Sequence, residues 1–157
     1  VKSNYKSILY RTEGRVATIT LNRPEHMNAI DLVMPTELKD AVFRANWDPN
    51  IHVIVLEGAG RGFCAGYDLK YFAENKNDES LTQQMPWDPL IDYQNMSYNT
   101  ECFMSVWKSL KPVICKVQGF AIAGGSDIAL CCDIVVAEEN AKFGYPPARV
   151  WGCPTTF

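Results

Sequence analysis

The chain has 157 residues, of which 47% are hydrophobic and 21% are charged, and its formal net charge is −3. Length and composition are those of one globular domain with a hydrophobic core. The negative net charge argues against a nucleic-acid partner, because such a partner is bound by a basic face. No apolar run reaches membrane-spanning length, so no membrane partner is expected either.

Six cysteines and two histidines limit the metal and redox chemistry that the chain can support. No pair of cysteines has CxxC spacing, and most lie in apolar surroundings. We therefore expect reduced core cysteines in a cytoplasmic protein. With only His26 and His52, a histidine-rich zinc site and a diiron site are not expected. The composition implies no metal and no redox cofactor.

The first part of the chain alternates predicted strands with a predicted helix. Residues 8–12 and 16–21 have the pattern of a β-hairpin. Asp31 is placed to cap a helix that has Pro35 in its first turn and apolar residues at helical spacing up to position 45. The unbroken apolar run 53–56 predicts a strand that is covered on both faces.

The second part continues this alternation after a loop. Residues 58–70 (GAGRGFCAGYDLK) form the predicted loop, and the polar stretch 72–89 predicts a mobile surface loop. Strands are expected at 113–117 and 134–137, and the alternation indicates an α/β chain. A helix is expected between the surface loop and residue 113, carrying Tyr93, Met96, Phe103, Val106, Trp107 and Leu110. Core packing is the leading interpretation of such residues, and the alternative is an apolar pocket lined by Met85, Trp87, Tyr93, Met96, Tyr98 and Trp107.

The last stretch, 142–157 (KFGYPPARVWGCPTTF), ends on an apolar residue directly after a loop, without a closing helix. A domain that stops there leaves a hydrophobic flank uncovered. We therefore expect one domain, 1–157, that is incomplete at its C-terminal side.

The most informative stretch is GFAIAGGSDIALCCD, residues 119–133. It predicts a glycine-permitted turn after a strand, followed by a helix that begins at Gly124–Gly125 and extends to Cys131. Unpaired N–H groups and the positive end of the helix dipole make such a start able to hold an oxyanion. Asp127 lies about one turn further on. The alternative is that the glycines only permit close packing and Asp127 is an ordinary first-turn charge.

Four segments together resemble the crotonase superfamily, the enoyl-CoA hydratase/isomerase family. They are RGFCAGYDLK (61–70), GFAIAGGSDIALCCDIVVA (119–137), LNRPEHMNAI (21–30) and KFGYPPARVWG (142–152). The resemblance covers essentially the whole chain and implies an α/β fold with a crotonase-like ββα spiral core, without the family's C-terminal helices. It also implies an acyl-CoA thioester as partner, with coenzyme A as part of the substrate and no separate cofactor. A homotrimer or a dimer of trimers is the implied assembly.

The resemblance also implies roles for individual residues. The main-chain N–H groups of Tyr67 and Gly124 match the donors that hold the thioester oxyanion, and Asp127 matches a catalytic carboxylate. The residues implied in binding coenzyme A or substrate are Met27, Asn28, Ala29, Ala65, Asp68, Leu69 and Lys70. Lys70 can equally be a solvated surface lysine, and Asp68 can instead cap the next helical turn. The side chain of Tyr67 is expected to shape the acyl pocket.

Pro147 stands where hydratases of this family carry a second carboxylate. Hydration of an enoyl-CoA remains the leading expectation. The alternatives are an isomerase or another CoA-thioester lyase that uses one carboxylate, and a non-catalytic acyl-CoA-binding homologue. A substitute group could come from Tyr145, Glu101, Asp88, Asp92 or an absent C-terminal region, and Arg149 could bind a substrate carboxylate. Ser126 lacks the GxSxG context of a hydrolase nucleophile.

Overall fold

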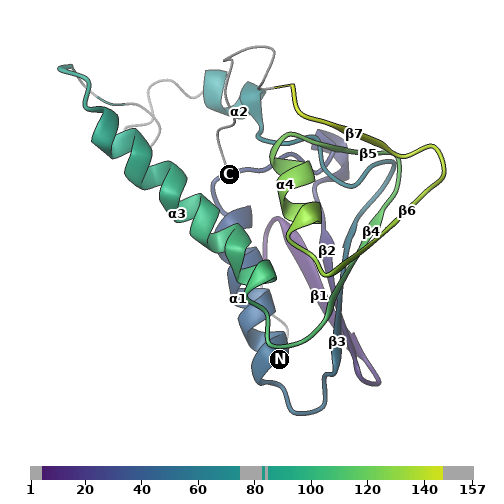
Figure 1. The fold of residues 1–157 in the computed structure, drawn as a ribbon. Coiled ribbons are helices and arrows are strands. Elements are labelled where there is room, and N and C mark those ends of the chain that lie inside the picture. The colour runs from purple at the N-terminus through teal and green to yellow at the C-terminus, as the bar shows by residue number, and fades with distance from the viewer. Residues whose placement is uncertain (1–4, 75–82, 84, 147–157) are drawn as a thin grey trace.

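In the computed structural model, which describes residues 5–74, 83 and 85–146, a five-stranded sheet forms the centre of the fold (Figure 1). Its strands lie in the order β1-β2-β3-β4-β6. The strand bounds are β1 Ile8–Glu13, β2 Val16–Leu21, β3 Val53–Gly58, β4 Val113–Val117 and β6 Ile134–Ala137. β1 is antiparallel to β2, and all other neighbours are parallel. This confirms the predicted α/β class and the N-terminal hairpin.

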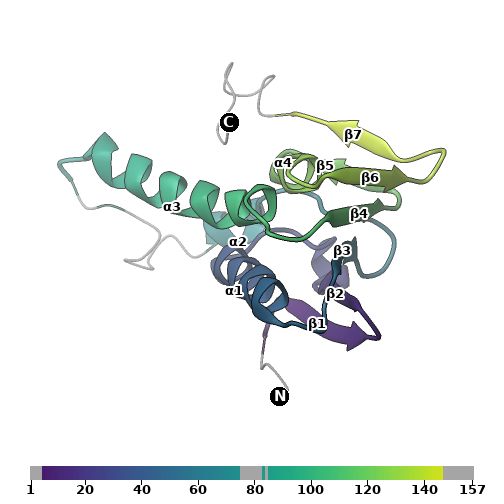
Figure 2. The ribbon, with the colours of Figure 1, turned by 60° about the horizontal axis from the view of Figure 1, so that its bottom comes forward.

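Two helices, α1 (Met34–Trp47) and α3 (Pro89–Trp107), lie together on the same side of the sheet (Figure 2). α1 begins as predicted, because the Asp31 carboxylate accepts hydrogen bonds from the N–H groups of Val33 and Met34 at 3.2 and 2.9 Å. It buries the apolar residues that recur at helical spacing, namely Met34, Leu38, Ala41, Val42 and Ala45. The periodic pattern therefore identified the helix face that packs onto the sheet.

The central strand β3 is covered by helices on one face only. Ile54 and Leu56 are buried, whereas Val55 and Glu57, which alternate with them along the strand, are half-buried. The Glu57 carboxylate pairs with Lys116 at 2.6 Å on the other face of the sheet. The expectation of a strand covered on both faces was therefore wrong. A short run of apolar residues does not distinguish a fully buried strand from a strand with one half-exposed face.

A second, two-stranded sheet consists of β5 (Phe120–Ile122) and β7 (Lys142–Gly144), which are parallel. Each strand has three residues, which is too short for an alternating pattern, so neither was predicted. α4 (Gly124–Leu130) begins directly after β5, at the glycine pair as expected. This small sheet lies beside β4 and α4 (Figure 1).

The structure corrects two expectations between positions 69 and 110. α2 (Leu69–Glu74) occupies the start of the stretch that was predicted to be a surface loop. Residues 75–82 and 84 lie outside the described residues. α3 begins at Pro89, after the capping residue Asp88, and ends at Trp107, so Leu110 is not part of the helix. The remaining short helix is a 3-10 turn at Pro24–His26.

The exposed apolar side chains include two groups. The flank formed by α4, β6 and β7 exposes Leu130, Ile134, Val136 and Phe143. The side chains suggested for an apolar pocket are largely exposed instead: Met85, Trp87, Tyr93, Tyr98 and Trp107. Pro147, Arg149 and Cys153 lie outside the described residues. No helix in the described part of the chain is long and apolar enough to cross a membrane.

Replacement of a buried leucine on the central strand tests the assigned core. Leu56 is 1% exposed, so Leu56→Ala should lower the free energy of unfolding by about 2–5 kcal/mol through lost burial and a residual cavity. Leu9→Ala on β1 is the matched control, because Leu9 is 51% exposed, and it should cost less than about 1 kcal/mol. Urea unfolding of both variants gives the comparison. Equal losses would contradict the assigned core.

Candidate active site

The loop that precedes α2 is held on two sides by main-chain pairing. Cys64 forms a parallel bridge with Ala121 of β5, and Tyr67 forms one with Ile30. The Cys64 carbonyl accepts a hydrogen bond from the N–H of Ile122 at 2.9 Å. Segments that are far apart in the sequence therefore fix the backbone of this loop, whatever its side chains are.

This pairing determines which way the main chain of Tyr67 faces. The N–H of Ile30 donates to the Gly66 carbonyl at 2.8 Å, and the N–H of Asp68 donates to the Ile30 carbonyl at 3.0 Å. In a parallel bridge, the residue between these two groups, here Tyr67, directs its own N–H to the side away from the segment with which it pairs. The N–H of Tyr67 therefore points away from Ile30.

Three glycines bring this loop against the start of α4. Gly66 has φ +88°, and a Cβ atom there would lie 2.9 Å from the Ile122 carbonyl oxygen and 3.5 Å from the Gly124 nitrogen. A Cβ atom on Gly125 would lie 2.5 Å from the Cys64 carbonyl oxygen, which is a main-chain clash. The proposed close packing at the glycine pair is therefore confirmed. It brings the main chain on either side of Gly66 next to Gly124.

The first turn of α4 begins from an unusual backbone conformation. Ala123 has φ 49° and ψ −123°, which a residue with a Cβ atom adopts only at a steric cost. Its carbonyl accepts hydrogen bonds from the N–H groups of Ser126 and Asp127 at 2.8 and 3.1 Å. Within the part of the chain that the structure describes, the N–H groups of Gly124 and Gly125 have no acceptor. The Ser126 hydroxyl donates back to the Ala123 carbonyl, consistent with a structural role.

Asp127 and Tyr67 lie at this same helix start. Asp127 is buried, with 9% of its surface exposed. The Tyr67 ring lies against the backbone of Gly124, since a Cβ atom there would be 3.3 Å from Cε2 of the ring. Burial raises the pKa of Tyr67 to about 12, and the negative charge of Asp127 acts in the same direction. At neutral pH the phenol is therefore uncharged.

Arg23 ties the neighbouring segment to the Tyr67 loop. Its guanidinium lies 2.9 Å from the Asp68 carboxylate and 3.3 Å from that of Asp31, and it also donates to the Ala29 carbonyl. The side chains of Arg23 and Asp68 are 13% and 8% exposed, so little water screens this pair. Sequence reasoning missed this role of Arg23. The sequence signal for it was an arginine between the end of a predicted strand and Pro24, with Asp31 further along the same segment.

Asp68 also caps α2, as the alternative interpretation proposed. Its carboxylate accepts a hydrogen bond from the N–H of Tyr71 at 3.0 Å. Burial acts to raise the pKa of Asp68, but the Tyr71 N–H and the Arg23 guanidinium outweigh it and hold this pKa below its usual value. The carboxylate is thus ionised and occupied with structural partners.

The structure brings together the two segments that were implied in coenzyme A binding. The N–H of Ala65 donates to the Met27 carbonyl at 3.1 Å. Asn28 is fully buried, and its side-chain amide donates to the carbonyls of Ala59 and Gly62 at 2.8 and 2.9 Å. Its side chain is therefore used within the protein. Ala29 is buried as well.

Three other residues implied in coenzyme A binding are exposed, unlike Asn28. Met27 and Leu69 are 40% and 65% exposed. Lys70 has an exposed side chain whose ammonium group lies 3.8 Å from the carboxylate of Glu74. Such an exposed pair contributes little to stability, so the lysine is able to meet another anion.

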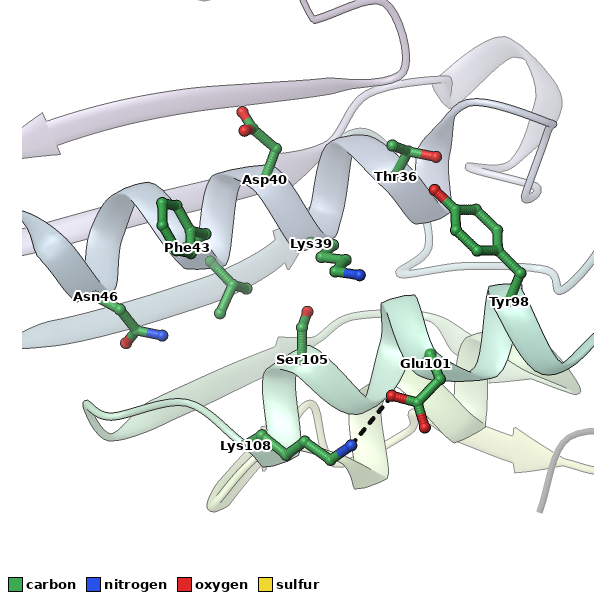
Figure 3. Close-up of a pocket in the computed structure, with 10 residues that line it drawn as sticks. Thr36, Lys39, Asp40, Phe43, Asn46, Tyr98, Glu101, Ser105 and Lys108 are labelled. Carbon is green, nitrogen blue, oxygen red and sulfur yellow. Dashed lines mark hydrogen bonds and ion pairs between the residues drawn. The ribbon is translucent and has the colours of Figure 1, made fainter.

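The carboxylates considered as substitutes for the one missing at position 147 are engaged elsewhere. Glu101 pairs with Lys108 at 3.1 Å beside a cavity of about 470 Å³ between α1 and α3 (Figure 3). Asp88 caps the first turn of α3. Asp92 accepts a hydrogen bond from the indole N–H of Trp87 at 2.8 Å. Tyr145, by contrast, lies near Tyr67.

In the described part of the chain, the cysteines are buried and no cluster of metal-binding side chains occurs. Five cysteines are buried free thiols, as expected: Cys64, Cys102, Cys115, Cys131 and Cys132. Burial raises the pKa of Cys64 to about 12, which leaves this thiol protonated and unreactive. Residues 5–74, 83 and 85–146 contain no group of three or more His, Cys, Asp or Glu side chains arranged to hold a metal ion.

Comparison with known proteins identifies related sequences and structures. Residues 11–155 match the sequence profile of the family described as enoyl-CoA hydratase/isomerase. A probable enoyl-CoA hydratase of Rhizobium meliloti is 35% identical over 147 residues, which are 91% of this chain and 50% of that protein. A 1,2-epoxyphenylacetyl-CoA isomerase of Escherichia coli is 38% identical over 141 residues, 87% of this chain and 49% of that protein.

A solved structure agrees with this match. The crystal structure of an enoyl-CoA hydratase from Mycobacterium smegmatis has a TM-score of 0.85 and 47% sequence identity, covering 96% of this chain and 53% of that chain. The chain thus spans about half the length of the relatives it matches. The likeness confirms the crotonase-like α/β fold over this half.

The Asp68 carboxylate gives the stability of the fold a defined dependence on pH. Its folded-state pKa lies below the ordinary value of 3.8, so its stabilising contribution is present above that pH and is lost as the pH falls through the lower folded-state pKa. Urea unfolding at a series of acidic pH values should show this loss. Asp68→Asn should show a smaller loss over the same range, and an identical pH dependence in both proteins would contradict the assignment.

Proposed function

Since the chain belongs to the enoyl-CoA hydratase/isomerase family, we propose that it is an enoyl-CoA hydratase whose oxyanion hole consists of the main-chain N–H groups of Tyr67 and Gly124. The observation that carries this proposal is the close approach of Gly66 to the Gly124 nitrogen at the start of α4. Two segments there present main-chain donors to one place. Fixed donors in a dry site stabilise a developing oxyanion by several kcal/mol.

In the proposed reaction the thioester carbonyl oxygen accepts hydrogen bonds from these two N–H groups. The oxygen atom of a water molecule bonds to the β carbon of the enoyl group, and the Asp127 carboxylate takes a proton from that water. The electron pair of the double bond moves onto the thioester as an enolate. The α carbon then receives this proton from Asp127, so one carboxylate both removes the proton from water and delivers it to the substrate.

Isomerisation is the second candidate, and a specific observation favours it. Pro147 offers no proton-carrying side chain where a second carboxylate is expected, and Glu101, Asp88 and Asp92 are engaged elsewhere. An isomerase needs one carboxylate that removes a proton from the α carbon and returns it to the γ carbon. A binding-only role is the third outcome that the assays below distinguish.

Coenzyme A is proposed to bind along the paired segments 27–29 and 65–70. Met27 and Leu69 offer exposed apolar surface, and the Lys70 ammonium group offers a point charge for a phosphate. The homotrimer, or dimer of trimers, remains a prediction that follows from the family resemblance, and the cytoplasmic location remains a prediction that follows from the cysteines.

Replacement of the proposed proton-transfer group tests the function. Asp127→Asn in the full chain should lower the turnover of crotonyl-CoA by about 100- to 10,000-fold, because the amide cannot exchange a proton. Binding of coenzyme A should be nearly unchanged. Glu101→Gln is the matched control, because its carboxylate pairs with Lys108 beside the cavity between α1 and α3, and it should turn over at the wild-type rate. Unchanged turnover in Asp127→Asn would remove Asp127 from the mechanism.

Two substrates separate the candidate reactions. Loss of the enoyl absorbance of crotonyl-CoA indicates hydration, whereas gain of that absorbance from a 3-enoyl-CoA indicates isomerisation. Activity only with the 3-enoyl substrate would overturn the hydratase proposal in favour of the isomerase. Measurable binding of both thioesters without turnover of either would establish the binding-only role.

A further inference from the structure

The side-chain amide of Asn28 is fully buried and is engaged in three hydrogen bonds with main-chain groups. Its oxygen accepts from the N–H of Arg23 at 2.8 Å. Its nitrogen donates to the carbonyls of Ala59 and Gly62 at 2.8 and 2.9 Å. An uncharged side chain that offers two donors and an acceptor from one planar group is an amide, so the partners at this position call for an amide side chain.

The main chain at Asn28 has a special conformation as well. Met27 and Asn28 have φ values of 55° and 53°, in the left-handed region, which asparagine enters more readily than most residues with a Cβ atom. The N–H of Asn28 donates to the Arg23 carbonyl at 2.8 Å, while its side chain accepts from the N–H of the same residue. Asn28 therefore fixes the turn after β2 through both its main chain and its side chain.

The residues on either side of Asn28 hold the part of the loop that carries Tyr67. The Met27 carbonyl accepts a hydrogen bond from the N–H of Ala65 at 3.1 Å. Ile30 forms hydrogen bonds with the residues directly before and after Tyr67, at 2.8 and 3.0 Å. The contacts that orient the main chain of Tyr67 therefore come from within two residues of Asn28.

Asn28 consequently holds one loop at two places. Its side chain bonds to carbonyls within 59–62, and its neighbours in the chain bond to residues 65–68. Between these places, the N–H groups of residues 63 and 64 donate to one carbonyl of β5 at 3.0 and 3.2 Å. Contacts on both sides of that pairing oppose rotation of the loop about β5, and a satisfied buried network of this kind is rigid. Such a rotation is the movement that would change the direction of the Tyr67 N–H.

From this arrangement we infer that Asn28 is a positioning residue for the oxyanion hole: its buried amide fixes the loop so that the main-chain N–H of Tyr67 points at the thioester oxygen together with that of Gly124. The inference rests on the proposed function and deepens it. Because the amide is buried and occupied by main-chain partners, it acts through the loop and not on the substrate. A misplacement of about 1 Å in a catalytic group can cost on the order of 100-fold in rate.

The variant Asn28→Gly tests this role, because glycine adopts the left-handed conformation without strain and only the amide is lost. The probe is butyryl-CoA labelled with carbon-13 at the thioester carbonyl, which has no double bond to hydrate. Hydrogen bonds to a carbonyl oxygen lower its stretching frequency. With the full wild-type chain, the infrared band of the bound probe should therefore lie below that of the free probe, and in Asn28→Gly it should move back toward the free position. The kcat for the enoyl-CoA that is turned over should fall about 10- to 100-fold.

Gln118→Leu is the matched control on the same loop. The Gln118 side-chain amide also donates to two loop carbonyls, those of Gly58 and Gly60, at 2.6 and 3.2 Å. Gly60 is exposed, so water can replace the lost partner there, and the band and kcat should stay close to those of the wild type. If Asn28→Gly fails to fold by circular dichroism, Asn28→Asp carries the same test, because it keeps the shape of the side chain and removes at least one of the two donors.

The possible outcomes separate this inference from the function on which it rests. A wild-type band at the position of the free probe overturns the proposed oxyanion hole, and the inference with it. A wild-type band that is shifted, and stays equally shifted in the Asn28 variant, overturns the positioning role and leaves the proposed function standing. Equal movement of the band in Gln118→Leu also overturns the positioning role, because any hydrogen bond to the loop would then have the same effect.

Discussion

The close approach of two backbone segments at Gly66, Gly124 and Gly125 is the constraint on which the candidate site depends. At Gly66 and Gly125 a Cβ atom would come within 2.5–2.9 Å of a main-chain carbonyl oxygen, and main-chain atoms cannot move aside as a flexible side chain can. The loop before α2 and the start of α4 therefore meet only because these side chains are absent. The spacing between the two candidate oxyanion donors is fixed by the fold, independently of the side chains that surround them.

Polar contacts help to keep the loops around the site in place. Arg23 joins Asp68 to Asp31, and the buried Asn28 amide joins the segment after β2 to the carbonyls of Ala59 and Gly62. Each of these buried groups has its partners, and a buried polar network is rigid when it is satisfied. These contacts hold the loops in fixed positions, which is what a site built from main-chain groups requires.

Sequence patterns predicted the long elements and the glycine junction, because these depend on local periodicity and on residues with distinct backbone properties. α1, β2 and β4 follow from repeating apolar positions, and α4 follows from its glycine pair. β5 and β7 could not be predicted in this way, because a strand of three residues is too short to show a pattern. The two strands are also distant in sequence, so no local signal indicates that they pair. The contacts of Arg23 and the position of the Tyr67 phenol depend on which segments become neighbours, and local sequence patterns do not reveal that. Family resemblance, not periodicity, assigned roles to Tyr67, Gly124 and Asp127.

The two segments that meet at the site have a further consequence for how the protein folds. Between Tyr67 and Gly124 the chain forms α2, α3, β4 and β5 before it returns. Bringing such distant positions together carries a loop-closure entropy that the local hairpin β1–β2 does not. The β1–β2 hairpin and α1 can therefore form before the candidate site exists, and the junction at Gly66 and Gly124 belongs to the late steps of folding. A folding intermediate of this chain would contain native secondary structure and a native hairpin, yet have no place to hold an oxyanion.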